Sequence, residues 1–116
     1  MNLKVGQAVW LKIPYPDGAP PDKNRPYLVV EAGGGEIGLL TVSTTEGKGG
    51  KLLYRSNYVL TSGCPPFKMP SFIKLDSLQV LPINAVLGCE LLAAGQKLND
   101  EDMRNILQQL EKYRPQ

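Results

Sequence analysis

One arginine has the sequence context of a residue that binds anions. Arg25 precedes Pro26, and a run of apolar, β-prone residues follows at 27–30, which predicts a strand that begins at the proline. Because a residue before proline is held extended, we expect the Arg25 guanidinium at the rim of a sheet. There it can make paired hydrogen bonds with a carboxylate or a phosphate. The alternative is a solvated arginine that ends a loop.

A second group of hydrogen-bond donors follows the strand predicted at 37–43. The next loop is polar and rich in glycine, with two hydroxyls at the strand end and two lysines beyond them: Thr44, Thr45, Lys48 and Lys51. The three glycines at 33–35 predict a hairpin turn. They do not form a P-loop, because no helix and no Lys-Ser or Lys-Thr pair follows them.

Two opposite charges form a third candidate group. Lys74 and Asp76 lie on one face if residues 71–81 form a continuous strand, because side chains alternate along a strand. They are either a surface ion pair, which contributes little to stability, or part of a charged site that also includes Arg25.

Composition limits the chemistry that these groups can perform. The 116 residues predict one soluble domain, and the net charge of +2 is too small to indicate a nucleic-acid-binding protein. With no histidine, the commonest general base and transition-metal ligand are missing, and two cysteines are too few for a disulfide scaffold or a zinc site. No apolar stretch is long enough to span a membrane, and the N-terminus lacks a signal-peptide pattern, so we expect a cytoplasmic protein.

The elements that position these residues are mostly strands. A strand at 6–13 carries Trp10, which we expect in the core, with a base-stacking platform as the alternative. Residues 14–24 contain four prolines and form either a binding loop or a surface connection. The run at 27–30 does not alternate, which indicates a strand covered on both faces.

The second half of the chain predicts shorter elements and one helix. Short strands are expected at 52–54 and 58–60, whereas 83–97 fits either a short strand or a helical turn. Asn99 precedes three acidic residues and an apolar stripe at helical spacing, so it is the expected N-cap of a C-terminal helix that runs to about Tyr113.

The order of these motifs resembles the MazF/PemK family of toxin ribonucleases from toxin–antitoxin modules. The resemblance covers nearly the whole chain, and its most specific parts are the Arg-Pro strand and the upstream Trp strand. The segments that carry it are Gly6-Gln7-Ala8-Val9-Trp10, residues 14–18, Asn24-Arg25-Pro26-Tyr27-Leu28-Val29-Val30, Val42-Ser43-Thr44-Thr45, residues 71–76 and Lys97-Leu98-Asn99-Asp100-Glu101-Asp102-Met103.

The resemblance implies a fold and an activity. The fold would be a mainly-β, SH3-like barrel of five to seven antiparallel strands (about 3–82) with a C-terminal α-helix (about 100–113), in one domain spanning 1–116. The protein would be a homodimeric endoribonuclease that cuts single-stranded RNA without a metal or cofactor. A cognate antitoxin would inhibit it, and the complex would bind DNA.

The resemblance also assigns roles to particular residues. Arg25 and Thr44 inherit the positions of active-site residues, and Lys74 and Asp76 those of the family's charged pair. In such a site Arg25 would stabilise phosphate charge, Thr44 would bind a phosphate oxygen, and Asp76 would take the 2′-OH proton or orient Arg25. The RNA-binding candidates are Lys23, Asn24, Thr45, Lys48, Lys51 and Tyr15, with Tyr54 and Tyr58 as further stacking residues.

Two other functions remain open on sequence alone. The same barrel can be a non-catalytic binding module for a protein partner or RNA, as the CcdB relatives of the fold suggest. It can also be a domain kept only for assembly. Toxicity that survives Arg25→Ala would indicate the first, and the second predicts neither toxicity nor RNA degradation.

Overall fold

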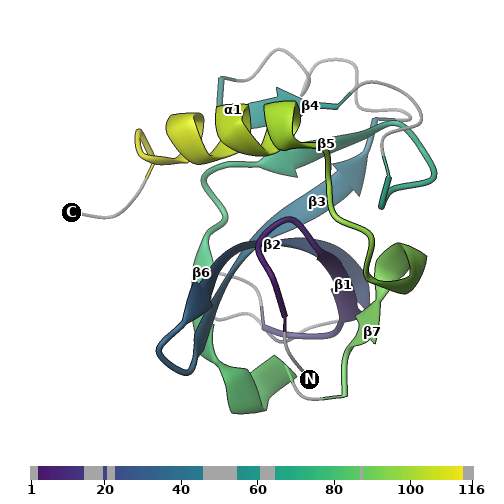
Figure 1. Ribbon diagram of the computed structural model, residues 1–116, viewed down its shortest axis with the longest axis vertical. Helices are drawn as coiled ribbons and strands as arrows, with labels where there is room; N and C mark the ends of the chain where they lie inside the picture. The colour runs from purple at the N-terminus through teal and green to yellow at the C-terminus, as the bar shows by residue number, and fades with distance from the viewer. Residues whose placement is uncertain are drawn as a thin grey trace.

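The computed structural model describes residues 3–14, 20, 23–45, 55–60, 65–86 and 88–113. Within these ranges it contains seven strands, two short 3-10 helices and one α-helix near the C-terminal end (Figure 1). The elements are β1 (Ala8–Leu11), β2 (Arg25–Gly33), β3 (Glu36–Thr44), β4 (Asn57–Val59), β5 (Ser71–Lys74), β6 (Gln79–Pro82), η2 (Ile83–Val86), β7 (Glu90–Leu91), η3 (Leu92–Gly95) and α1 (Asp100–Leu110).

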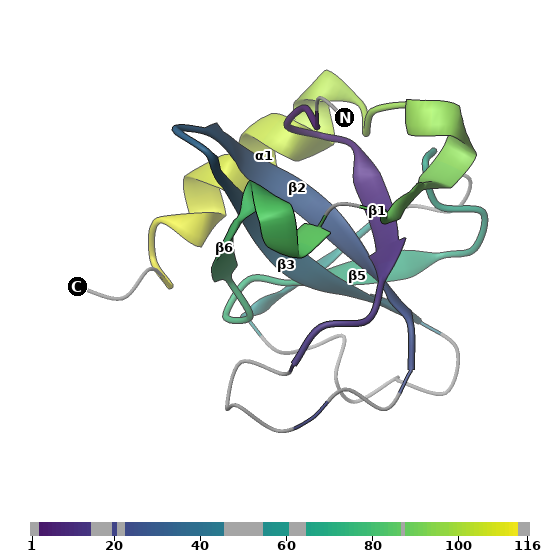
Figure 2. The ribbon, with the colours of Figure 1, turned by 90° about the horizontal axis from the view of Figure 1, so that it is seen from below.

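The strands form one antiparallel sheet built around β3. The strand order is β4-β5-β3-β2-β1-β7, and β6 also pairs with β3. β3 binds β6 along its first half and β5 along its last residues, while β2 lies on its other edge. Figure 2 shows β1, β2 and β3 side by side, and Figure 1 shows α1 across the sheet near β4 and β5. The expected fold class, a mainly-β structure of five to seven antiparallel strands with a C-terminal helix, is confirmed.

β2 is buried on both faces, as its unbroken apolar run predicts. Leu28 and Val30 pack in the core that α1 covers, together with Ile106. Tyr27 and Val29 point to the opposite face and join a second core beneath the N-terminal segment. The sheet therefore separates two hydrophobic clusters, which fixes the register of β2 because a one-residue slip would exchange its faces.

Local signals at the hairpin and the helix are also confirmed. Gly34 and Gly35 form the turn between β2 and β3 with φ of +61° and +80°, values that favour glycine. The Asn99 side chain accepts a hydrogen bond from the Asp102 backbone N–H at 2.8 Å and caps α1. Asp102 in turn accepts a bond from the Tyr58 hydroxyl at 2.7 Å, which ties the helix to β4.

The expectation of one strand over 71–81 is wrong. β5 ends at Lys74, a turn follows, and β6 begins at Gln79 and pairs with the other half of β3. The Ser77 hydroxyl holds this turn, because it donates to the Lys74 carbonyl at 2.6 Å and accepts from the Thr41 N–H at 2.8 Å. Lys74 is therefore half-buried on β5, whereas Asp76 is exposed in the turn, and the two do not share a strand face.

The expectation that Trp10 is a core residue is also wrong, since its side chain is 39% exposed. Its neighbours on β1, Val9 and Leu11, point into the second core and are buried. Trp10 points to the other face with Ala8, but Ala8 packs in the α1 core and Trp10 does not. The physical reason is that this core ends before the far end of β1.

The segment 83–97, which the sequence left open between strand and helical turn, contains both types of element. η2 and η3 flank the short strand β7, which pairs with β1. Within the described ranges, no helix is both long and apolar enough to cross a bilayer. Tyr15, Lys48, Lys51 and the strand expected at 52–54 lie outside the described residues.

Candidate active site

The start of β2 and the end of β3 meet at one open cavity. β1 pairs with β2 so that Trp10 lies opposite Pro26 and Leu11 opposite Arg25. β2 pairs with β3 so that Tyr27 lies opposite Thr41, and continuing this register places Arg25 across from Ser43. The resulting cavity of about 580 Å³, called the Arg25 cavity below, is lined by Trp10, Lys23, Asn24, Arg25, Pro26, Val42, Ser43 and Thr44.

Arg25 is the first residue of β2 and is half-buried, as the Arg-Pro pattern predicts. The Nε atom of its guanidinium is buried. A guanidinium held in this way at a strand end is well placed to bind an anion, because less side-chain freedom is lost when the ligand arrives.

Four of the sequence candidates are brought together here: Arg25, Thr44, Lys23 and Asn24 line one cavity. Thr44 is exposed at the end of β3, so its hydroxyl can reach a ligand. Thr45 has a different role. Both its backbone N–H and its hydroxyl donate to the Pro70 carbonyl, at 3.0 and 3.4 Å, which fastens the segment before β5 to β3.

Lys74 and Asp76 lie apart from this cavity. β5 pairs with β3 so that Ser71 lies opposite Thr44 and Ile73 opposite Val42, which places Lys74 further along the sheet, away from Arg25. Asp76 follows in the turn beyond β5. Neither residue lines the Arg25 cavity, so the sequence-based grouping of Asp76 with Arg25 is not seen within one chain.

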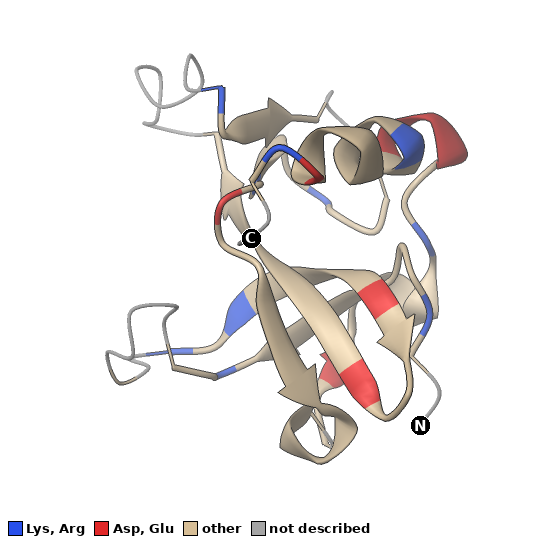
Figure 3. Ribbon diagram, turned by 90° about the vertical axis from the view of Figure 1, so that its left-hand side faces the viewer, with Lys and Arg blue, Asp and Glu red and all other residues tan. Residues whose placement is uncertain are grey.

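Charge is unevenly distributed along the sheet (Figure 3). Lys23 and Arg25 lie where β2 begins, whereas the acidic residues of β2 and β3, Glu31 and Glu36, lie toward the hairpin that joins these strands. The cationic end therefore coincides with the Arg25 cavity, and this arrangement favours a negatively charged ligand there.

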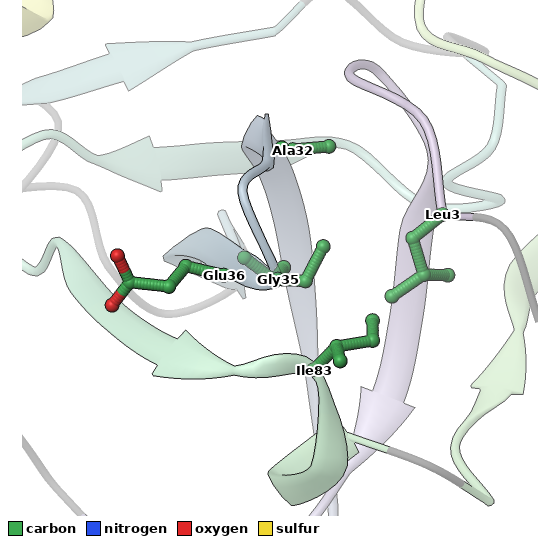
Figure 4. A pocket seen from close by; sticks show the side chains of 7 residues that line it. Leu3, Ala32, Gly35, Glu36 and Ile83 are labelled. Carbon is green, nitrogen blue, oxygen red and sulfur yellow. The ribbon is translucent and has the colours of Figure 1, made fainter.

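A second cavity, near the hairpin, is chemically different (Figure 4). It has a volume of about 290 Å³ and is lined mainly by aliphatic residues and glycine, including Leu3, Ala32 and Ile83. Glu36 is its charged residue, and its carboxylate points away from the others (Figure 4). We therefore place the candidate site at the Arg25 cavity.

Trp10 is the site residue that our sequence reasoning misassigned, because it lines the Arg25 cavity instead of the core. The alternation of β1 indicates that Trp10 and Ala8 share a face, but it does not show where the covering helix ends. The described residues contain no cluster of three or more His, Cys, Asp or Glu side chains arranged to hold a metal ion.

Comparison with known proteins identifies the fold. No model of a protein family matches the sequence, and no curated protein does. An endoribonuclease from mycobacterial species has a similar structure, with a TM-score of 0.63 and 16% identity over 97% of this chain and 92% of that chain. The MazE–MazF crystal structure from Deinococcus radiodurans gives a TM-score of 0.63 and 17% identity over 97% and 93% of the two chains. The chain thus has a MazF-like fold.

Proposed function

We propose that this protein is the toxin of a toxin–antitoxin module and that it cleaves single-stranded RNA at specific short sequences. The observation that carries the proposal is the meeting of Arg25 and Thr44 in one open cavity at the cationic end of the sheet. The fold supports it, because one of the two similar structures is an endoribonuclease and the other contains a MazE–MazF pair.

The proposed reaction is an attack by the RNA on its own backbone. The 2′ oxygen attacks the adjacent phosphorus and the bond from phosphorus to the 5′ oxygen breaks, which leaves a 2′,3′-cyclic phosphate and a 5′-OH. The 2′-OH loses a proton and the leaving oxygen gains one. Because the nucleophile is already tethered beside the phosphorus, positioning and charge stabilisation accelerate the reaction, and we propose that no metal is needed.

The residues of the cavity have distinct roles in this reaction. Arg25 stabilises the negative charge that develops on the phosphate oxygens, and the Thr44 hydroxyl donates a hydrogen bond to one of them. Lys23 and Asn24, both exposed at the entrance, bind the neighbouring backbone. Because Asp76 lies in the turn beyond β5, we assign it no part in this step within one protomer.

Proton removal from the 2′-OH is assigned to solvent. Among the described residues that line the cavity, the charged ones are Lys23 and Arg25, and both side chains are hydrogen-bond donors without an acceptor. Hydroxide is then the base, so the logarithm of the cleavage rate should rise by about one per pH unit through neutrality. A bell-shaped profile centred near pH 7 would instead indicate a protein base.

The test is cleavage of a long single-stranded RNA in EDTA by the purified protein and matched variants. Arg25→Ala should lower the rate by about 10²–10³, the usual loss when one transition-state donor is removed, and Arg25→Lys should restore only part of it. Thr44→Val should also lower the rate, whereas Val80→Ala, on an exposed residue of β6, should not. Intact RNA after incubation with the wild-type protein would refute the proposal.

One observation favours a second candidate, a binding module without catalysis. The described lining of the cavity provides cations and hydroxyls but no side chain that is a base at neutral pH. Growth arrest that survives Arg25→Ala, with RNA left uncut by the wild type, would favour this function. Loss of both cleavage and growth arrest in the folded variant would exclude it.

The proposal includes two protein partners and a cytoplasmic location. We propose a homodimer, and light scattering that shows a monomer at all micromolar concentrations would contradict it. We also propose an antitoxin whose acidic, disordered segment covers the cationic end of the sheet. Such a segment should compete with RNA, and raising the salt concentration should weaken its binding.

A further inference from the structure

A second, apolar cavity adjoins the Arg25 cavity. It has a volume of about 370 Å³ and shares Trp10, Pro26 and Thr44 with it, so the two cavities lie side by side. Its other walls come from the segment before β5 and from the end of β7 and the turn after it, and they include Phe67, Met69, Leu91 and Ala93. We call it the Trp10 cavity.

Two large apolar side chains are exposed at the Trp10 cavity. Trp10 is 39% exposed and Met69 is 50% exposed, and both face this cavity. An indole and a thioether gathered at one hollow provide a stacking surface for a flat, apolar group. A hollow with this lining suits a ligand that carries an apolar face.

The backbone of η3 is held in an unfavourable conformation beside the cavity. Ala93 and Ala94 have φ of 51° and 55°, the left-handed region that a residue with a Cβ rarely adopts. Buried Gln7 fixes the turn, because its Nε2 donates to the Gly95 carbonyl at 3.1 Å and its Oε1 accepts from the Lys4 N–H at 2.8 Å. Left-handed residues held in this way concentrate at ligand-binding sites.

The two cavities match the two parts of a nucleotide. The Arg25 cavity is cationic and suits a phosphate, and the Trp10 cavity beside it suits the planar, aromatic base. We propose that the Trp10 cavity binds the unpaired base next to the cleaved phosphate and that this base stacks on Trp10. This inference rests on the function proposed above. The walls are mainly apolar, so the site selects for a stacking surface and discriminates weakly between bases.

Trp10 is the only tryptophan in the sequence, so its fluorescence reports directly on this cavity. The ligand is a mixed-sequence 2′-fluoro RNA oligonucleotide, which lacks the 2′-OH nucleophile, and the control is an abasic oligonucleotide of equal length and charge. The base-bearing oligonucleotide should quench Trp10. Binding of the abasic oligonucleotide is measured with a dye attached to its end. It should bind about tenfold more weakly and leave Trp10 fluorescence unchanged.

Variants separate stacking from general binding. Trp10→Leu should weaken the base-bearing oligonucleotide about tenfold and leave the abasic one unaffected, and Trp10→Phe should retain most of the affinity. Val80→Ala, exposed on β6 and away from both cavities, is the matched control and should behave as the wild type. Far-UV circular dichroism confirms that each variant is folded.

Three results would overturn the inference. The first is Trp10 fluorescence that stays unquenched at a saturating concentration of the base-bearing oligonucleotide. The second is an equal loss of affinity for both oligonucleotides in Trp10→Leu. The third is quenching by an acidic peptide with an aromatic residue but not by the oligonucleotide. If RNA is still cleaved in any of these cases, the proposed function stands and only the base site fails. If neither oligonucleotide binds and RNA stays intact, both proposals fail.

Discussion

Removing one serine hydroxyl should destabilise the junction between β5 and β6. Ser77 is buried, and its hydroxyl joins the Lys74 carbonyl at 2.6 Å to the Thr41 N–H at 2.8 Å. In Ser77→Ala the Thr41 N–H loses its acceptor in the middle of β3. The Lys74 carbonyl keeps one partner, because the Ser77 backbone N–H donates to it at 3.2 Å.

The size of the effect follows from the group left without a partner. A buried N–H that loses its acceptor costs about 1–3 kcal/mol, and Thr41 is only half-buried, so we expect a loss of about 2 kcal/mol in the free energy of unfolding. For a chain of this length that corresponds to a fall in Tm of about 8 °C. Ser77→Cys, which keeps the volume but has a weak donor and acceptor, should lose nearly as much.

Urea unfolding followed by circular dichroism measures this loss, with Val80→Ala as a surface control expected to change stability by less than about 0.5 kcal/mol. Amide hydrogen exchange locates it, because the Thr41 amide should exchange faster in Ser77→Ala. A variant within about 0.5 kcal/mol of the wild type, or one with unchanged exchange at Thr41, would refute the reasoning.

Two further predictions concern contacts that hold the sheet to its neighbours. Burial and the hydrogen bond to Asp102 raise the pKa of Tyr58 above its usual 10.0, so the stability that this hydroxyl contributes is present below pH 10 and is lost as pH rises through the higher folded-state pKa. Urea midpoints between about pH 9 and pH 11 should fall more steeply for the wild type than for Tyr58→Phe, and parallel curves would contradict this. Gly6→Ala should lower the free energy of unfolding by about 2 kcal/mol, because Gly6 has φ of +99° and an added Cβ would lie 3.3 Å from the Lys97 Cβ. An unchanged thermal midpoint would show that this backbone relaxes freely.

Local patterns in the sequence were sufficient to predict the elements that present the site. Arg25 before Pro26 marks the start of β2, and an unbroken apolar run marks a strand with two buried faces. The Asn99 cap of α1 and the glycine turn after β2 depend on neighbouring residues alone, so they too were predicted correctly. The meeting of Arg25 with Thr44 follows once the hairpin places the two strand ends side by side.

The incorrect predictions depend on contacts between residues far apart in the sequence. The alternation of side chains over 71–81 does not indicate that the Ser77 hydroxyl binds the Thr41 N–H on another strand and that β5 ends before it. The exposure of Trp10 depends on how far the α1 core extends over β1, which the pattern of β1 itself does not contain. That strand break also places Asp76 in the turn beyond β5.

The most direct test of the central claim is the chemistry of the cut ends in EDTA. The cleaved position is first mapped on a long RNA, and a short RNA is then made with a single 2′-deoxy nucleotide on the 5′ side of that phosphate. We predict 2′,3′-cyclic phosphate and 5′-OH ends for the unmodified RNA, no cut at the deoxy position, and a rate about 10²–10³ lower for Arg25→Ala. Ends bearing 3′-OH and 5′-phosphate, or cleavage at the deoxy position, would contradict the account.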